Sequence, residues 1–268
     1  MREITHTLDM SLDQRNEALT SEGWVVIPAV IDATLIDELT AALIPSLARR
    51  DAIRQRNGVS ENTDGTLHHL LMDAPCYLDL LSSLRKLDPV FSGFFASKYI
   101  LNAYGGVVNE AGKRSYVQHV HRDLRFTSDS KRFMMNILVM LDDFTEENGA
   151  TYVLSSSHGM HDKPEDDFFF QNAKRMTGSR GSVLLFDSRI WHAAGVNSTL
   201  RPRRALTLSL TSPFFKQQLD YPRLFGYENA SSCDEWMRQV IGFNSRTPQS
   251  LEEFYVPVTR RFYQPNQD

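Results

Sequence analysis

The sequence predicts an all-β core with flanking helices, an α+β arrangement. Six short segments between residues 98 and 212 are rich in β-branched and aromatic residues, and glycine- or asparagine-containing turns separate them. Before them, apolar residues recur at helical spacing. Short strands with such punctuation are typical of a double-stranded β-helix (jelly roll, cupin-like). We therefore expect a single domain over 1–268, with a helical part over about 1–97, a jelly-roll core over about 98–212 and a C-terminal extension over 213–268.

The helical part begins with a short strand, WVVIP, that ends at Pro28. The segment IDATLIDELTAALIPSLARR then carries leucine and isoleucine at helical spacing, which predicts a helix that Asp32 caps and that Pro45 kinks or breaks. Residues 51–69 are polar and indicate a loop.

A second helix is predicted over CYLDLLSSLRKL, and Asp88-Pro89 should stop it, because the residue before a proline disfavours helical geometry.

The predicted strands of the core are short and follow one another closely. They are KYILNAYGGVV, YVQHVHRD, RFMMNILVML, ATYVLS, GSVLLFD and RALTLSLTS. The tail after Pro213 is mixed and aromatic, and we expect it to pack on the outside.

Composition excludes several classes of protein. The net charge of −4 provides no global basic surface, so we expect no nucleic-acid partner. No apolar run approaches the roughly 20 residues that span a bilayer, and the N-terminus lacks the apolar core of a secretion signal. The two cysteines, Cys76 and Cys233, are far apart and are expected to be reduced. We expect a cytoplasmic protein without membrane contact, and base rates favour a homodimer.

Three residues carry the chemistry that the sequence suggests. His121 and Asp123 lie two apart in a predicted strand, so their side chains should point to one face. His192 ends another predicted strand. Two histidines and one carboxylate on one face of a metal leave three positions open, which suits non-haem Fe(II) and the binding of a co-substrate together with O2. The pair His121-x-Asp123 is a weak signal by itself.

Arg203 strengthens the prediction of a metal site. It follows His192 closely and opens a strand, where its guanidinium could hold the far carboxylate of 2-oxoglutarate through two parallel hydrogen bonds. Arg203 and Arg204 must point to opposite faces of the strand, so at most one faces inward. Arg201 is expected to be solvated.

Other polar residues leave alternatives open. Asn136 sits in an apolar run, and its amide needs a partner, either 2-oxoglutarate or a neighbouring strand or loop. Gln118 is a weaker candidate for the co-substrate, since a regular strand turns it away from His121. His119 could rival the metal ligands, contact substrate or simply pack. His68 and His69 could face the site or cap a helix.

The aromatic run Phe168–Phe170 could form a flap over substrate or pack within a loop.

Taken together, the chain resembles the phytanoyl-CoA dioxygenase family, a branch of the Fe(II)/2-oxoglutarate oxygenases. The similar stretches are EGWVVIPAVID, QHVHRD, LDDFTEENGATYVLSSSH, GSVLLFDSRIWHAAGVN and RPRRALTLS, in family order over about residues 20–212. The resemblance implies that His121, Asp123 and His192 bind iron and that Arg203 binds 2-oxoglutarate. The glycine that often precedes the histidine of the family's Gly-Ser-His turn is replaced here, giving Ser156-Ser157-His158, and we treat His158 as structural.

The resemblance implies oxidation of a small-molecule substrate by O2, with release of succinate and CO2. Halogenating relatives have a small residue where this chain has Asp123, so a carboxylate favours hydroxylation, with desaturation or ring formation as alternatives. Two other classes stay open from the residues alone. One is a zinc-dependent, cupin-like hydrolase or isomerase, because zinc also accepts two histidines and a carboxylate. The other is a non-catalytic jelly-roll binding module.

Overall fold

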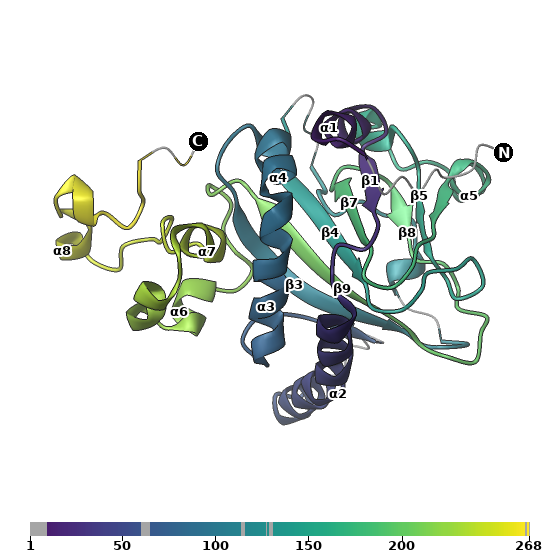
Figure 1. The fold of residues 1–268 in the computed structure, drawn as a ribbon, viewed down its shortest axis with the longest axis horizontal. Coiled ribbons are helices and arrows are strands. Elements are labelled where there is room, and N and C mark those ends of the chain that lie inside the picture. Colours follow the sequence, from purple (N-terminus) through teal and green to yellow (C-terminus); the bar gives the residue numbers. More distant parts are fainter. Residues whose placement is uncertain are drawn as a thin grey trace.

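The computed structural model describes residues 10–59, 65–113, 116–126, 128, 131–265 and 267. Two antiparallel sheets and a set of flanking helices make up the fold (Figure 1). The major sheet has the strand order β1-β7-β4-β9-β3-β2, and the minor sheet has the order β6-β5-β8. The strands are β1 Trp24–Ile27, β2 Thr66–Leu67, β3 Ile100–Asn109, β4 Met134–Met140, β5 Thr151–Val153, β6 Lys174–Met176, β7 Val183–Asp187, β8 His192–Ala193 and β9 Arg203–Thr211. The predicted all-β core with flanking helices is confirmed.

Both faces of the major sheet are buried, and alternation along each strand divides the core in two. Ile137 and Val139 of β4 pack in the cluster that includes the helices, whereas Leu138 and Met140 pack with residues of the minor sheet. Successive strand residues point to opposite faces, so one apolar run serves both layers. This sandwich leaves the space between the sheets as the place for a site.

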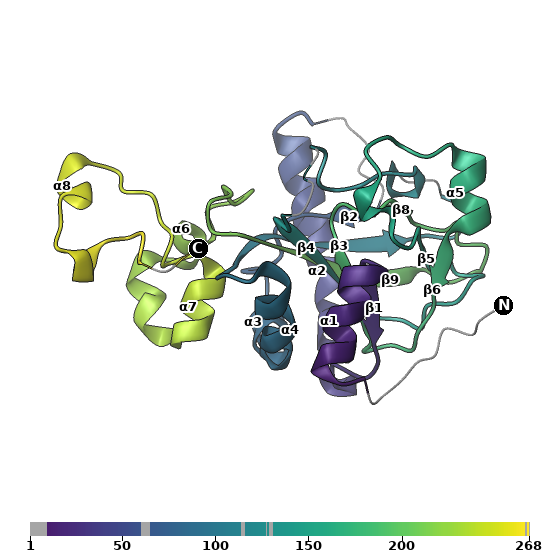
Figure 2. The ribbon, with the colours of Figure 1, turned by 90° about the horizontal axis from the view of Figure 1, so that it is seen from above.

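Four N-terminal helices accompany the major sheet. They are α1 Leu12–Ser21, α2 Ala33–Arg56, α3 Pro75–Leu84 and α4 Asp88–Phe95. Figures 1 and 2 show α1, α3 and α4 along one side of the sheet. The predicted cap is confirmed, because the Asp32 carboxylate accepts a hydrogen bond from the Leu35 N–H.

Three N-terminal predictions are wrong in part. The helix α2 is not broken at Pro45 but continues to Arg56, so tertiary packing overrides the cost of a proline inside a helix. The expected loop over 51–69 instead holds the last turns of α2 and the edge strand β2. Asp88-Pro89 does not stop the helical region but starts α4, where the missing N–H of proline is not needed.

The predicted strand over 116–123 is also wrong. The segment forms a 3₁₀ turn, Tyr116–Gln118, and then pairs at one point, where His121 and His192 exchange backbone hydrogen bonds of 3.0 and 2.9 Å. The N–H of Asp123 bonds instead to the carbonyl of Ser188 at 3.1 Å. The N–H groups of His121 and Asp123 therefore bond to different segments, so residues 116–123 form no continuous β-ladder.

The C-terminal extension contributes α6 Tyr221–Phe225, α7 Glu235–Ile241 and α8 Leu251–Phe254, with α8 far from both sheets (Figure 1). Tyr221 is fully buried against the body of the protein. None of the helices in the described part of the chain has the length and apolar character needed to cross a membrane.

Candidate metal and co-substrate site

The two histidines and the aspartate meet between the sheets. His121, Asp123 and His192 each offer a ligand atom, and these three atoms lie within 4.8 Å of one another. Nε2 of each histidine is 3.7 Å from an oxygen of Asp123, and the two imidazole centroids are 4.3 Å apart. The bridge between His121 and His192 sets this geometry, although the predicted strand is absent.

Backbone carbonyls orient both imidazole rings. Nδ1 of His121 lies 2.7 Å from the carbonyl oxygen of His119, and Nδ1 of His192 lies 3.0 Å from that of Ile190. Since a carbonyl can only accept, each Nδ1 carries the proton and each Nε2 keeps its lone pair for a metal. Burial lowers the pKa of His192 to about 4, with the neighbouring His121 as the next cause. The His192 ring is therefore neutral near pH 7, as a metal ligand must be.

Asn136 orients the aspartate. Its amide N–H donates to Oδ2 of Asp123 at 2.6 Å, and its amide oxygen accepts from the Ser209 hydroxyl at 2.7 Å. Of the two alternatives for this buried amide, the structure shows partners within the protein. Such a second layer of hydrogen bonds fixes the direction of a ligand carboxylate.

A cavity of about 610 Å³ surrounds the three residues, and Asn136 and Arg203 also line it. This volume is in the range of pockets that take small organic molecules, roughly 300–1,000 Å³.

Arg203 is a buried cation whose hydrogen-bonding capacity is only partly used. Its side chain is 2% exposed, and its Nη2 donates to the carbonyl of Gly149 at 2.9 Å. Its guanidinium lies over the Phe144 ring, 4.3 Å from the centroid, and its Nε is buried without a partner. In the described residues no carboxylate lies within ion-pair distance of it. Burial accordingly lowers the pKa of Arg203 to about 10.

A buried guanidinium without a counter-ion is costly unless a ligand supplies the anion. The carboxylate of 2-oxoglutarate would supply that anion, and the donor set of the triad suits iron. The residues therefore fit both groups.

The backbone at residue 149 requires a glycine. It has a φ of +82°, and a Cβ there would lie 2.4 Å from the carbonyl oxygen of Gly195. A side chain would displace the carbonyl that holds Arg203.

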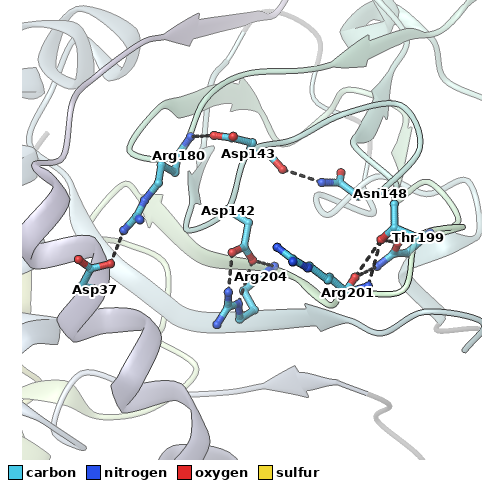
Figure 3. A network of polar contacts seen from close by, with 9 residues as sticks. Asp37, Asp142, Asp143, Asn148, Arg180, Thr199, Arg201 and Arg204 are labelled. Atoms are coloured by element: carbon cyan, nitrogen blue, oxygen red, sulfur yellow. Dashed lines mark hydrogen bonds and ion pairs between the residues drawn. The ribbon is translucent and has the colours of Figure 1, made fainter.

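Arg204, the next residue along β9, anchors the strand on its opposite face. Arg204 donates to Asp142 through its backbone N–H, Nε and Nη2, at 2.7, 2.9 and 2.6 Å. Figure 3 shows this pair together with Arg201, which is exposed as predicted. Because Asp142 fixes Arg204 outward, strand alternation points Arg203 inward, as expected from the sequence.

The same figure shows how the neighbouring loops are tied together. Arg180 connects Asp143, through its backbone N–H at 2.8 Å, to Asp37 of α2, through Nη2 at 2.5 Å (Figure 3). Asn148 donates to the Asp143 carbonyl at 2.6 Å. These contacts hold the turn that leads to Gly149 and thus the wall around Arg203.

Other predicted residues lie elsewhere. Gln118 is half-buried on the 3₁₀ turn and is not among the residues that line the cavity, although its neighbours Tyr116 and Val117 are. His119 is exposed and outside the ligand cluster, and it contributes its backbone carbonyl.

The aromatic run forms part of a helix, α5 Asp166–Asn172, with Phe169 buried and its two neighbours about half exposed.

Several polar residues at the cavity were not predicted from the sequence, among them Thr66, Ser209 and Gln218. The Thr66 hydroxyl is buried without a hydrogen-bond partner, Gln218 comes from the C-terminal extension, and Ser209 supports Asn136. Their sequence surroundings carry no motif, so only the packing of the extension and of β2 against β3 could reveal them.

Comparison with known proteins places the site in a family. The model of the phytanoyl-CoA dioxygenase (PhyH) family matches residues 19–205, a stretch that includes the triad and Arg203. An uncharacterised protein of Mycobacterium tuberculosis, Rv1501, is 28% identical over 96% of both chains. Dioxygenase olcK of Penicillium canescens is 24% identical over 81% of this chain and 76% of its own length.

A solved structure supports the fold. The structure of EctD from S. alaskensis with 2-oxoglutarate and 5-hydroxyectoine has a TM-score of 0.62, covering 75% of this chain and 76% of its own at 19% identity.

Proposed function

The chain belongs to the phytanoyl-CoA dioxygenase family and is an Fe(II)/2-oxoglutarate-dependent dioxygenase, and on that basis we propose which residues act and on what. His121, Asp123 and His192 hold the iron, and Arg203 holds the far carboxylate of 2-oxoglutarate. The observation that carries this proposal is that the three ligand atoms, within 4.8 Å of one another, share one cavity with a buried guanidinium without a counter-ion.

When bound, iron and 2-oxoglutarate supply the oxidation of a substrate C–H bond by O2, with release of succinate and CO2. The chain's own residues bind and orient. The carbonyls of His119 and Ile190 fix the imidazoles, and Asn136 fixes Asp123. Arg203 is buried, and this low-dielectric position strengthens its contact with an anion.

The substrate is a small molecule, and the reaction is a hydroxylation. The cavity of about 610 Å³ supports the first statement, because it exceeds what 2-oxoglutarate alone needs. Asp123 supports the second, because its carboxylate fills the position where a small residue would leave room for a halide.

The test is an anaerobic titration of the protein with Fe(II) and then 2-oxoglutarate. We expect the weak visible metal-to-ligand charge-transfer band in wild type and in His119→Ala, and its loss in Asp123→Ala. The control is well matched, because His119 is exposed and contributes only its backbone carbonyl. A wild-type protein that binds zinc but never develops the band contradicts the proposal and favours a hydrolytic or structural site.

A further inference from the structure

The cavity has a second polar wall, formed by His68 and His69 between β2 and α3. Arg50 of α2 holds this segment in place. Its Nε donates to the carbonyl of His68 at 2.6 Å, and its Nη2 donates to that of His69 at 2.7 Å. The same guanidinium also pairs with Asp73. One half-buried arginine thus fixes the backbone of two consecutive residues that line the cavity.

His69 has a strained backbone. Its φ of +58° lies in the left-handed region, which few residues other than glycine adopt. Such strain persists only where surrounding contacts enforce it, often at ligand sites. Here Arg50 and the bond from the Leu70 N–H to the Tyr104 carbonyl, 2.9 Å, enforce it. The result is an imidazole held against the cavity.

The C-terminal extension sets the proton on that imidazole. The hydroxyl of Tyr221 lies 3.1 Å from Nδ1 of His69. Burial raises the pKa of Tyr221, and the neighbouring backbone N–H of Tyr104 opposes this rise, so the hydroxyl keeps its proton near neutral pH. The Tyr221 hydroxyl is fully buried, so its proton needs an acceptor within the protein, and among the described contacts that acceptor is Nδ1 of His69. Nδ1 is then the acceptor, and the proton of the neutral ring is on Nε2.

The ring is neutral at physiological pH. Burial lowers the pKa of His69, and the neighbouring His68 and Arg50 lower it further. Burial lowers the pKa of His68 as well. The described lining therefore includes uncharged donors, His69 and the amide of Gln218, and Arg125 is a cation there besides Arg203. In the described lining the only carboxylate is Asp123, which the metal uses, so an ammonium group would find no counter-charge.

Resting on the function proposed above, we propose that His69 is a substrate-positioning residue whose Nε2–H donates a hydrogen bond to an oxygen acceptor of the substrate. The substrate class is a small molecule with a carbonyl, ether or hydroxyl oxygen rather than an amine. Tyr221, from the C-terminal extension, is the residue that fixes this tautomer. The extension thereby takes part in substrate recognition, although the family match ends at residue 205.

The tautomer can be measured without any substrate. Long-range ¹H–¹⁵N correlation of the full chain, with diamagnetic Zn(II) in place of Fe(II), reports which ring nitrogen carries the proton. The His69 signals are identified by their loss in His69→Gln. We expect the Nε2–H form in wild type and a mixture of forms in Tyr221→Phe. A wild-type ring protonated at Nδ1 overturns the proposal, whether or not the protein binds iron.

Recognition is tested with a matched pair of variants. In His69→Gln the new amide N–H can take the place of the Nε2–H donor. In His69→Asn the amide lies where Nδ1 was, so the donor at Nε2 is lost. The probes are ketones, lactones and glycosides, with amine analogues as controls, scored by substrate-dependent succinate formation in wild type. We expect the KM for an active probe to rise roughly 10- to 100-fold in His69→Asn and much less in His69→Gln, with the KM for the co-substrate unchanged.

The free energy of unfolding should be higher for His69→Asn than for His69→Gln, because Asn tolerates a left-handed backbone better than Gln. Urea unfolding separates this effect from substrate recognition. Equal losses in both variants, activity only with amines, or a raised KM for the co-substrate overturn the proposal. Absence of iron and 2-oxoglutarate binding in wild type would instead count against the function proposed above, and the tautomer measurement keeps the two failures distinguishable.

Discussion

At the metal triad, the polar atoms that face away from the ligand are bonded to the protein, whereas Arg203 keeps a buried Nε without a partner. A second buried arginine makes the contrast sharper. Arg189 is 4% exposed, and its Nε and Nη2 contact Asp187 at 3.0 and 2.7 Å. Arg203 is equally buried but has a carbonyl and an aromatic ring in place of a carboxylate.

This difference distinguishes a buried arginine that stabilises the fold from a buried arginine that binds a ligand. Arg189 has its counter-ion within the fold, so the pair contributes to stability only as long as both partners are present. Arg203 has no counter-ion in the described part of the chain, so its burial destabilises the fold until an anionic ligand binds. A buried cation whose nearest described partners are uncharged therefore indicates a ligand, and the following experiments test this distinction.

The largest effect is expected at the triad itself. His192→Ala removes a buried ligand whose ring the Ile190 carbonyl orients. We expect Fe(II) retention and succinate formation to fall by at least about 100-fold, because two ligands rarely hold a metal that three hold. His161→Ala, an exposed histidine outside the cluster, is the control and should behave as wild type. Undiminished turnover in His192→Ala would show that the iron lies elsewhere.

The structural arginine should matter mainly for stability. Arg189→Met leaves Asp187 buried without its partner, and we expect the free energy of unfolding to fall by about 3–5 kcal/mol. Urea unfolding followed by circular dichroism measures this change. A loss below about 1 kcal/mol would mean that the buried pair is not a structural element, and the contrast with Arg203 would fail.

The ligand-binding arginine should show the opposite pattern. Arg203→Met removes a charge without a partner, so we expect an unfolding free energy equal to or above that of wild type. The Kd for 2-oxoglutarate should rise roughly 10- to 100-fold, from the loss of charge-assisted hydrogen bonds. Fe(II) binding, measured in the same anaerobic titration, should not change.

Arg204→Met is the matched control for that variant, because Arg204 is adjacent but faces outward toward Asp142. It should leave the Kd for 2-oxoglutarate within a few-fold of the wild-type value. If both variants weaken 2-oxoglutarate binding equally, Arg203 acts through the strand rather than through its guanidinium.

The smallest effect is expected from the residue that orients the aspartate. Asn136→Ala removes the bond to Asp123 but no ligand, and we expect Fe(II) affinity to fall about 10-fold. Ser209→Ala removes the next bond in the chain and should have a weaker effect in the same direction. A loss of 2-oxoglutarate affinity with unchanged iron affinity would instead favour direct contact between Asn136 and the co-substrate.

The fold class and the chemistry of the site can be predicted from the amino-acid sequence alone. The continuous burial of β4 follows directly from its apolar run, and strand alternation is enough to decide that Arg203 and Arg204 of β9 face apart. The residue types of His121, Asp123 and His192, in their order, predict a metal site and resemble one family. These properties are local or periodic, so they can be read along the chain.

How those residues meet depends on the tertiary structure. His121 and Asp123 share a site without lying on a strand, because their backbone N–H groups bond to the carbonyls of His192 and Ser188, which are distant in the sequence. Pro45 is tolerated within α2, and Tyr221 reaches His69 across 152 positions of the chain. Such contacts depend on which segments pack together, a property of the whole chain that no local pattern encodes.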